Sequence, residues 1–294
     1  MLQTRSPAEA WPARSTVNAI LDRHHLLHKN RRRRTWTHPG VAPLVTQRPN
    51  EVWPADFTGQ FRTGDGRYCF PLTITDHFSR AVLTCHGLRT VMTRDVKPVW
   101  RALFRAVGLP DAIRTDNGPP FASTGIHGLT TLNVWWMQLG IVHQRITPAS
   151  PQDNGTHERM HRELKRETAR PAAATLPAQQ RRFDAFRQRY NDERPHEALN
   201  GDTPSARWYP SARPFPERLA APDYPAHMEV RRVSTAGTFR LGARRQPFLS
   251  HALSGQDIAL EEVDDGIWNI VYYRTLLGKI DERTSRITGT KPGK

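Results

Sequence analysis

The order of strand-like and helix-like segments between residues 51 and 146 constrains the fold of this chain most strongly. Residues 51–61 have the pattern of a strand, and residues 64–88 contain two more strands behind a Gly-Asp-Gly hairpin turn. Helical and strand-like segments then alternate, at residues 94–107, 111–118, 129–139 and 141–146. This order predicts a mixed α/β domain.

Prolines and glycines mark where these elements begin and end. Pro54 is unwelcome inside a central strand, so we expect the first strand to begin at about Ala55, with the proline at its entrance. Pro98 falls in the first turn of the helix expected at 94–107, where proline is tolerated, and Gly108 ends that helix. The apolar residues of this helix share one face: Val96, Val99, Trp100, Leu103, Phe104 and Val107. Two more helices are expected at 155–169 and 178–191.

The sequence pattern changes after a cluster of prolines at residues 210–225. From residue 226 onward the pattern is one of short strands separated by Gly or Asp-Asp-Gly turns, and no helical period is present. The expected strands lie within residues 227–233, 237–241, 257–263, 267–273 and 276–281. This pattern predicts a small β-barrel of SH3 type.

Positive charge is spread along the whole chain. The formal net charge is +15, from 43 Lys and Arg against 28 Asp and Glu, and the simplest partner for such a surface is a nucleic acid. A merely basic protein is the alternative. A short helix is expected at residues 15–27 with Ser15 as its N-cap, and four arginines follow it: Arg31, Arg32, Arg33 and Arg34. The run is either a solvated linker or a contact for phosphates, and the overall charge favours the second.

Other features narrow the protein class. Cys69 and Cys85 form no CxxC pair and no disulfide framework, which argues against a zinc site and fits a reducing cytoplasm. No apolar run approaches the length of a membrane span, and the N-terminus lacks the apolar centre of a signal peptide. We therefore expect a cytoplasmic protein without a membrane partner.

Three acidic residues occur at unusual places in this basic chain. Asp56 lies among apolar neighbours on the first strand, where aspartate is disfavoured unless it faces water or has a function. Asp116 ends the expected strand AIRTD, residues 112–116, and precedes Asn117-Gly118, which ordinary turn chemistry also explains. Glu158 falls near a helix start, where the helix dipole favours a carboxylate. Each residue alone therefore has a structural explanation.

Taken together, the three carboxylates predict a metal site. Phosphodiester chemistry needs an activated oxygen nucleophile and a stabilised leaving oxygen, and two divalent metals supply both. Two aspartates on adjacent strands and a glutamate on a helix packed across them can hold such ions. Mg²⁺ fits best, because it takes oxygen ligands and keeps part of its water.

Five motifs in this chain resemble the DDE transposases and integrases, and most closely the bacterial insertion-sequence transposases with a retroviral-integrase-type core. In chain order the motifs are VWPADFTG, DHFSRAV, IRTDNGPPFAS, TPASPQDNGTHERMHRELK and YNDERPHEALNGDTP. The resemblance covers roughly residues 12 to 215. It implies an RNase H-like core with a mixed five-stranded sheet and flanking helices. It also implies that Asp56, Asp116 and Glu158 are the catalytic, metal-binding triad for two Mg²⁺ or Mn²⁺ ions.

Residues next to the triad are assigned supporting roles. Arg162 and Lys165 follow Glu158 at +4 and +7 on one helix face, where they form an intrahelical pair with Glu158 or contact phosphates. The resemblance favours phosphate contact, so we group them with Arg31–Arg34 as DNA-binding residues. A set around the triad is expected to orient it: Asn117, Asn154, Gly155 and His157.

The resemblance implies a transposase that cleaves DNA at transposon ends and joins the freed 3′ end to target DNA. Residues 1–45 would be the remnant of a helix-turn-helix region with a basic linker, 46–215 the catalytic core, and 223–294 a DNA-binding β-barrel. The expected partners are transposon-end and target DNA and further copies of the chain, and the expected location is the bacterial cytoplasm, at the nucleoid. Two alternatives stay open: a truncated DNA-binding relative that regulates transposition without catalysing it, and a nuclease of the same fold.

Overall fold

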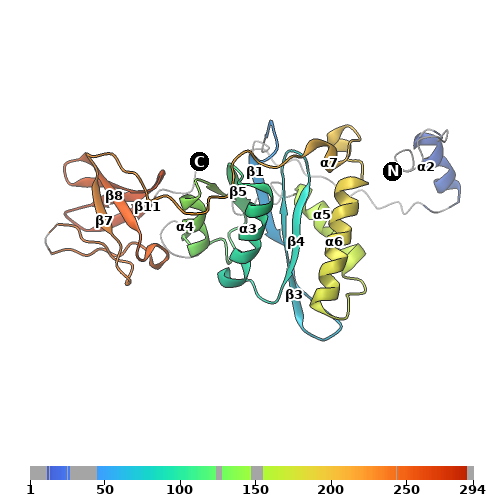
Figure 1. Ribbon diagram of the computed structural model, residues 1–294, viewed down its shortest axis with the longest axis horizontal. Coiled ribbons are helices and arrows are strands. Elements are labelled where there is room, and N and C mark those ends of the chain that lie inside the picture. The colour runs from blue at the N-terminus through green and yellow to red at the C-terminus, as the bar shows by residue number, and fades with distance from the viewer. Residues whose placement is uncertain are drawn as a thin grey trace.

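The computed structural model describes residues 45–123, 128–146, 155–242 and 244–289, together with residues 12, 14–24 and 26 near the N-terminus. The elements in these residues form an α/β core followed by a separate β-sheet, as Figure 1 shows. Among the helices in these ranges, none is long and apolar enough to cross a membrane.

A mixed β-sheet forms the centre of the core. Its main strands are β1 (Val52–Phe57), β3 (Tyr68–Thr75), β4 (Val82–Leu88), β5 (Ala112–Thr115) and β6 (Val142–Arg145), and the short β2 (Phe61–Arg62) pairs with β3. The strand order is β4-β3-β1-β5-β6. Strand β3 is antiparallel to β1 and β4, while β1, β5 and β6 are parallel. The expected mixed sheet of RNase H-like type is confirmed.

The expected start of the first strand is wrong. Strand β1 begins at Val52, so Pro54 lies inside it. The reason is visible in the pairing: Pro54 pairs with Arg114 of β5, whereas the ladder between β1 and β3 begins only at Ala55. A proline has no N–H to donate, and the β3 ladder does not reach the position where that donor is missing.

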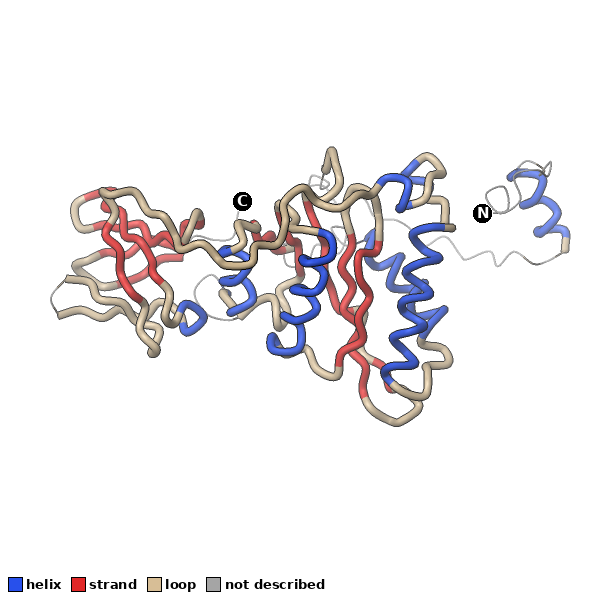
Figure 2. The backbone as a smooth tube through the Cα atoms, in the orientation of Figure 1, coloured by secondary structure: helices blue, strands red, loops and turns tan. Residues whose placement is uncertain are grey.

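Helices cover both faces of this sheet, as Figure 2 shows. The helices are α3 (Thr93–Val107), α4 (Thr131–Gln138), α5 (Gly155–Thr168), α6 (Leu176–Asp192) and α7 (Pro204–Arg207), with a short 3₁₀ helix η3 (Glu197–Leu199) before α7. Helices α3 and α4 pack on one face, and α5 and α6 pack on the other. The helices expected at 94–107, 129–139, 155–169 and 178–191 are therefore confirmed to within a few residues.

Two apolar clusters hold these layers together. The larger one lies between the sheet and α3 and α4, and Trp53, Trp100 and Trp136 are completely buried in it. The smaller one joins the sheet to α5 and α6 and contains both cysteines, which are free thiols. Burial raises the pKa of the Cys69 thiol to about 11, so the thiol stays protonated and behaves as a core residue.

The N-terminal helix is shorter than expected. Helix α2 spans Arg14–Arg23, so Ser15 lies inside the helix and is not its cap. The four arginines Arg31–Arg34 lie outside the described residues.

The C-terminal part forms a second, antiparallel sheet. Its strands are β7 (Glu229–Arg232), β8 (Asp257–Asp264), β9 (Ile267–Tyr272), β10 (Thr275–Asp281) and β11 (Arg286–Gly289), in the order β11-β10-β9-β8-β7. The strand expected at 237–241 is wrong, because that segment makes only two isolated bridges; β11 was not expected. The sheet fits the SH3-like type, although no ladder joins β11 to β7 within the described part of the chain.

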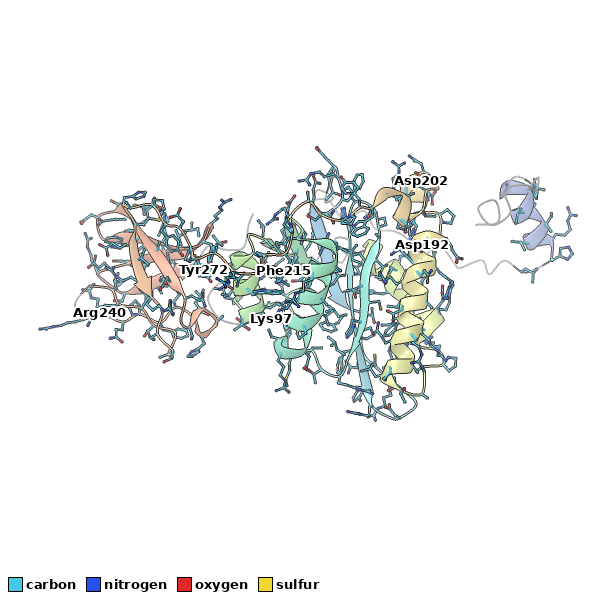
Figure 3. All side chains as sticks on the ribbon, viewed as in Figure 1. Lys97, Asp192, Asp202, Phe215, Arg240 and Tyr272 are labelled. Atoms are coloured by element: carbon cyan, nitrogen blue, oxygen red, sulfur yellow. The ribbon has the colours of Figure 1, made fainter. Side chains whose placement is uncertain are left out.

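Helix α4 connects the core to the C-terminal sheet. Leu129 and Val134 of the core belong to the apolar cluster of the C-terminal sheet, and α4 contacts the 3₁₀ helix η4 (His251–Leu253) of that part. Gln138 of α4 donates hydrogen bonds to Gln256 Oε1 at 2.9 Å and to Tyr272 Oη at 3.0 Å. The Tyr272 hydroxyl in turn donates to Gln256 at 2.9 Å, which closes a polar triangle. Figure 3 labels Tyr272 on the side of the C-terminal sheet next to the core.

We expect Tyr272→Phe to lower the free energy of unfolding by about 1 kcal/mol, because the triangle loses two of its three hydrogen bonds. Urea unfolding followed by tryptophan fluorescence measures this. Tyr209→Phe is the matched control, since that side chain is 55% exposed and its hydroxyl makes no hydrogen bond within the described residues. Equal effects of both variants would contradict the role given to the triangle.

Candidate active site

Two of the three predicted carboxylates come from neighbouring parallel strands. Ala55 of β1 pairs with Thr115 of β5, and Asp56 and Asp116 each follow one residue later. Because the carboxyl ends of parallel strands meet at one edge of a sheet, with strands roughly 4.8 Å apart, both aspartates lie at the same edge. The structure therefore places Asp56 and Asp116 at matching positions on adjacent strands.

The Asp56 carboxylate is 21% exposed and lies against helix α5. Its Oδ1 accepts a hydrogen bond from the Phe57 amide at 2.7 Å. Its Oδ2 lies 3.9 Å from Nδ1 of His161. One oxygen thus takes part in fixing the side chain, and the other faces a histidine ring.

Asp116 is held by the turn that follows β5. Asn117 donates from Nδ2 to the Ile146 carbonyl at 2.8 Å, which ties the turn to the end of β6. A Cβ at Gly118 would lie 2.9 Å from Asp116 Oδ2, so only glycine leaves the carboxylate its present position. Asn117 therefore fixes the turn next to Asp116, and its orienting role stays a prediction.

The third predicted carboxylate lies on a helix and not on a strand. Glu158 is in the first turn of α5 and is exposed, whereas its neighbour His157 is buried. Among the residues that the structure describes, no three His, Cys, Asp or Glu side chains gather as a metal site. The chemistry of the donors suits a hard divalent cation, but only Asp56 and Asp116 share one edge here. Asn154 lies outside the described residues, and Gly155 is the first residue of α5.

A single hydroxyl links Asp56 to the helix that carries Glu158. Thr73 of β3 is the register partner of Asp56, and its Oγ1 lies 3.1 Å from the Asp56 carbonyl. The same Oγ1 lies 3.1 Å from Nε2 of His157 and 2.7 Å from Nε2 of His161. We call Thr73, His157 and His161 the Thr73 hub. Sequence reasoning missed Thr73 and His161, although the spacing of four residues between the histidines places both rings on one helix face.

The donors and acceptors of the Thr73 hub determine which of its atoms carry protons. The Asp56 carbonyl can only accept, so the Thr73 hydroxyl donates its one proton there, and both imidazoles donate Nε2–H to Oγ1. Burial lowers the pKa of His157 to about 4 and that of His161 to about 2, so both rings are neutral near pH 7. A neutral ring protonated at Nε2 has its lone pair at Nδ1. His161 Nδ1 and Asp56 Oδ2 are therefore two donor atoms that could share a cation.

Basic side chains lie on the same helix. A Cβ at Gly59 would come within 3.2 Å of Lys165 Nζ, so the ammonium lies over the turn that follows β1. Arg162 is exposed. Further along, Glu163 forms an ion pair with Arg194, which fixes α5 to the segment after α6. Helix α5 therefore carries cations beside the edge that holds the aspartates.

The strand order of the mixed sheet and the helices on both of its faces define an RNase H-like core. The profiles of the Integrase core domain family match residues 46–151 and residues 139–204. The chain belongs to the integrase core family of DDE transposases and integrases. Among the members of that family it is similar to proteins of bacterial insertion elements.

Two of these relatives and one solved structure show the extent of the similarity. The chain is 34% identical over 164 residues to a protein of insertion element IS407 from Burkholderia multivorans, covering 53% of this chain and 54% of the relative. It is 31% identical over 189 residues to a protein of insertion element IS476 from Xanthomonas euvesicatoria, covering 62% and 51%. The chain thus spans about half the length of these curated relatives. The HTLV-2 integrase catalytic core domain in complex with magnesium is 18% identical, with a TM-score of 0.42 over 54% of this chain and 97% of that chain.

Proposed function

We propose that this protein is a transposase that cleaves DNA at transposon ends and transfers the freed 3′ end into target DNA. The observation that carries the proposal is the placement of Asp56 and Asp116 one residue beyond paired residues of adjacent parallel strands. Membership of the integrase core family supports it. A site built from strand-end carboxylates next to a basic helix suits reactions of a phosphodiester.

Asp56 and Asp116 are the residues that would hold divalent ions, Mg²⁺ or Mn²⁺, and Glu158 would complete the set from the first turn of α5. Two bound divalent ions supply an activated oxygen nucleophile and stabilisation of the leaving oxygen. Neighbouring residues of the chain orient the two carboxylates. The Phe57 amide orients the Asp56 carboxylate, and Asn117 holds the turn that presents Asp116.

DNA is the proposed substrate in both half-reactions. Lys165, above the turn after β1, and the exposed Arg162 would contact phosphates near the scissile bond. Arg31–Arg34 and the C-terminal sheet would add backbone contacts that are independent of sequence. The proposed units are a linker region at 1–45, a catalytic core at 46–215 and a DNA-binding unit at 223–294. We propose that the protein acts as a homo-oligomer on DNA, at the bacterial nucleoid.

A strand-cleavage and joining assay tests this function. The full chain is incubated with a labelled oligonucleotide that carries an element end, with a target duplex, and with Mg²⁺ or Mn²⁺. We expect cleaved product and longer joined product, both lost on chelation by EDTA. Cleavage without joining would indicate a nuclease of the same fold. Binding without either product would indicate a DNA-binding relative.

A further inference from the structure

A hollow of about 400 Å³ lies at the start of helix α3, away from the candidate active site. Its walls are the first two turns of α3 and the first residue of α4: Thr93, Arg94, Lys97, Pro98, Arg101 and Thr131. Helices α3 and α4 cover one face of the sheet, and α5 covers the other. The hollow and the Glu158 helix are therefore on opposite sides of the sheet.

Positive charge in this hollow is not balanced by acids. None of Arg94, Lys97 and Arg101 forms an ion pair with a carboxylate among the described residues, and no carboxylate lines the hollow. Asp95, on the same turn, accepts a hydrogen bond from the Thr90 hydroxyl instead. Burial and, to a smaller extent, the nearby Arg101 charge lower the pKa of Lys97.

Part of the wall of the hollow packs against the buried core. The Lys97 ammonium lies 5.0 Å from the centre of the Trp135 ring, and Trp135 is buried in the core. Figure 3 labels Lys97 on α3, on the side toward α4 and the C-terminal sheet. Thr93 and Thr131 add hydroxyls that can donate hydrogen bonds to an oxyanion. The capping residue of α3, Met92, gives no side-chain hydrogen bond to the helix N-terminus, and Asp95 is the acidic residue of the first turn.

The cations of the hollow continue as a line along α3. Arg94, Lys97, Arg101 and Arg105 follow one another at spacings of three, four and four residues, which places them on one helix face. The line is roughly 16 Å long at 1.5 Å per residue. This length equals the axial rise of about five base pairs of a duplex, at 3.4 Å per nucleotide of one strand.

We propose that this hollow and the adjoining face of α3 bind the phosphate backbone of a DNA segment away from the scissile bond. The proposal deepens the proposed function and rests on DNA being its substrate. A free phosphate or nucleotide shares the recognised chemistry, but a single small anion would leave Arg105, whose guanidinium lies over the Phe215 ring at the far end of the line, without an anionic partner. A polymer of phosphates occupies the whole line.

Fluorescence anisotropy of a labelled duplex across a range of salt concentrations tests the proposal. The variant Arg94→Gln/Lys97→Gln/Arg101→Gln removes three cations from the hollow. Each lost phosphate contact lowers the slope of log Kd against log salt by about 0.9, so we expect a decrease of about 2 to 3. At about 0.1 M salt this corresponds to a loss of affinity of roughly 10²-fold.

The matched control is Arg181→Gln/Arg187→Gln/Arg218→Gln, which removes the same charge from exposed positions that make no ion pair within the described residues. We expect a much smaller change of slope from this control. Equal changes in the two variants would overturn the proposal, because net charge alone would then explain them. Tight, saturable binding of inorganic phosphate to the wild type, lost in the hollow variant, would also overturn it in favour of a small-anion site.

Failure of the inference can be told apart from failure of the proposed function. If the wild-type chain binds no duplex and yields no cleaved or joined product, the proposed function is wrong. If the wild type binds and reacts while the hollow variant matches its control, the function stands and the α3 face is not the binding surface.

Discussion

Replacing Asp116 by asparagine is expected to reduce DNA cleavage and joining by about 10³-fold or more. The amide has nearly the same shape as the carboxylate but carries no charge, so it binds a divalent ion poorly. A metal ion contributes several kcal/mol to such a reaction, and about 4 kcal/mol corresponds to about 10³ in rate. Single-turnover assays with Mg²⁺ and a labelled end oligonucleotide measure the loss.

The same variant should keep its fold and its affinity for DNA. Asp116 follows the last residue of β5, and the hydrogen bond from Asn117 to Ile146 does not involve the Asp116 side chain. We expect duplex affinity within about twofold of wild type. Asp223→Asn, on an exposed loop, is the control and should react like wild type. If Asp116→Asn retains a tenth of the activity, Asp116 is not a metal ligand and the triad assignment is wrong.

The layered core could be predicted because its signals are local. Each strand and helix of residues 51–192 is marked by apolar spacing or by a turn residue, and the order of elements restricts the topology. The two aspartates could be placed on the sheet in advance for a similar reason, since Asp56 lies on the first strand and Asp116 directly follows β5. Local sequence patterns therefore predict both the α/β core and the two aspartates of the candidate site.

The remaining features depend on contacts between distant residues. Pro54 is tolerated in β1 because the β3 ladder begins one residue later, which no property of residues 51–61 indicates. The segment 237–241 alternates like a strand but makes only two bridges, because strand formation depends on a neighbour that the segment cannot specify. Thr73 looked like one more residue of an apolar strand. Its role follows from meeting a helix that begins 82 residues later.

We expect the second large effect on activity from Thr73→Val, because this substitution disturbs the positioning of Asp56. Valine keeps the shape of threonine but removes the hydroxyl that serves the Asp56 carbonyl, His157 and His161. Three polar groups then lose a partner in a region where Thr73 itself is 0% exposed. Residues that support metal ligands typically affect metal affinity or activity by 10- to 100-fold when they are changed. We expect weaker Mn²⁺ binding and slower cleavage in that range.

Binding of Mn²⁺, followed through the electron paramagnetic resonance signal of the free ion, separates positioning from general instability. Thr73→Ser keeps the hydroxyl and should restore most of the affinity. Thr75→Val is the matched control, because Thr75 lies two residues further along β3, is 9% exposed and makes no side-chain hydrogen bond among the described residues. If Thr73→Val binds Mn²⁺ as tightly as Thr75→Val does, the hydroxyl only packs the strand against α5. If Thr73→Ser is as weak as Thr73→Val, keeping the hydroxyl does not keep Mn²⁺ binding, and the Thr73 hub does not orient Asp56.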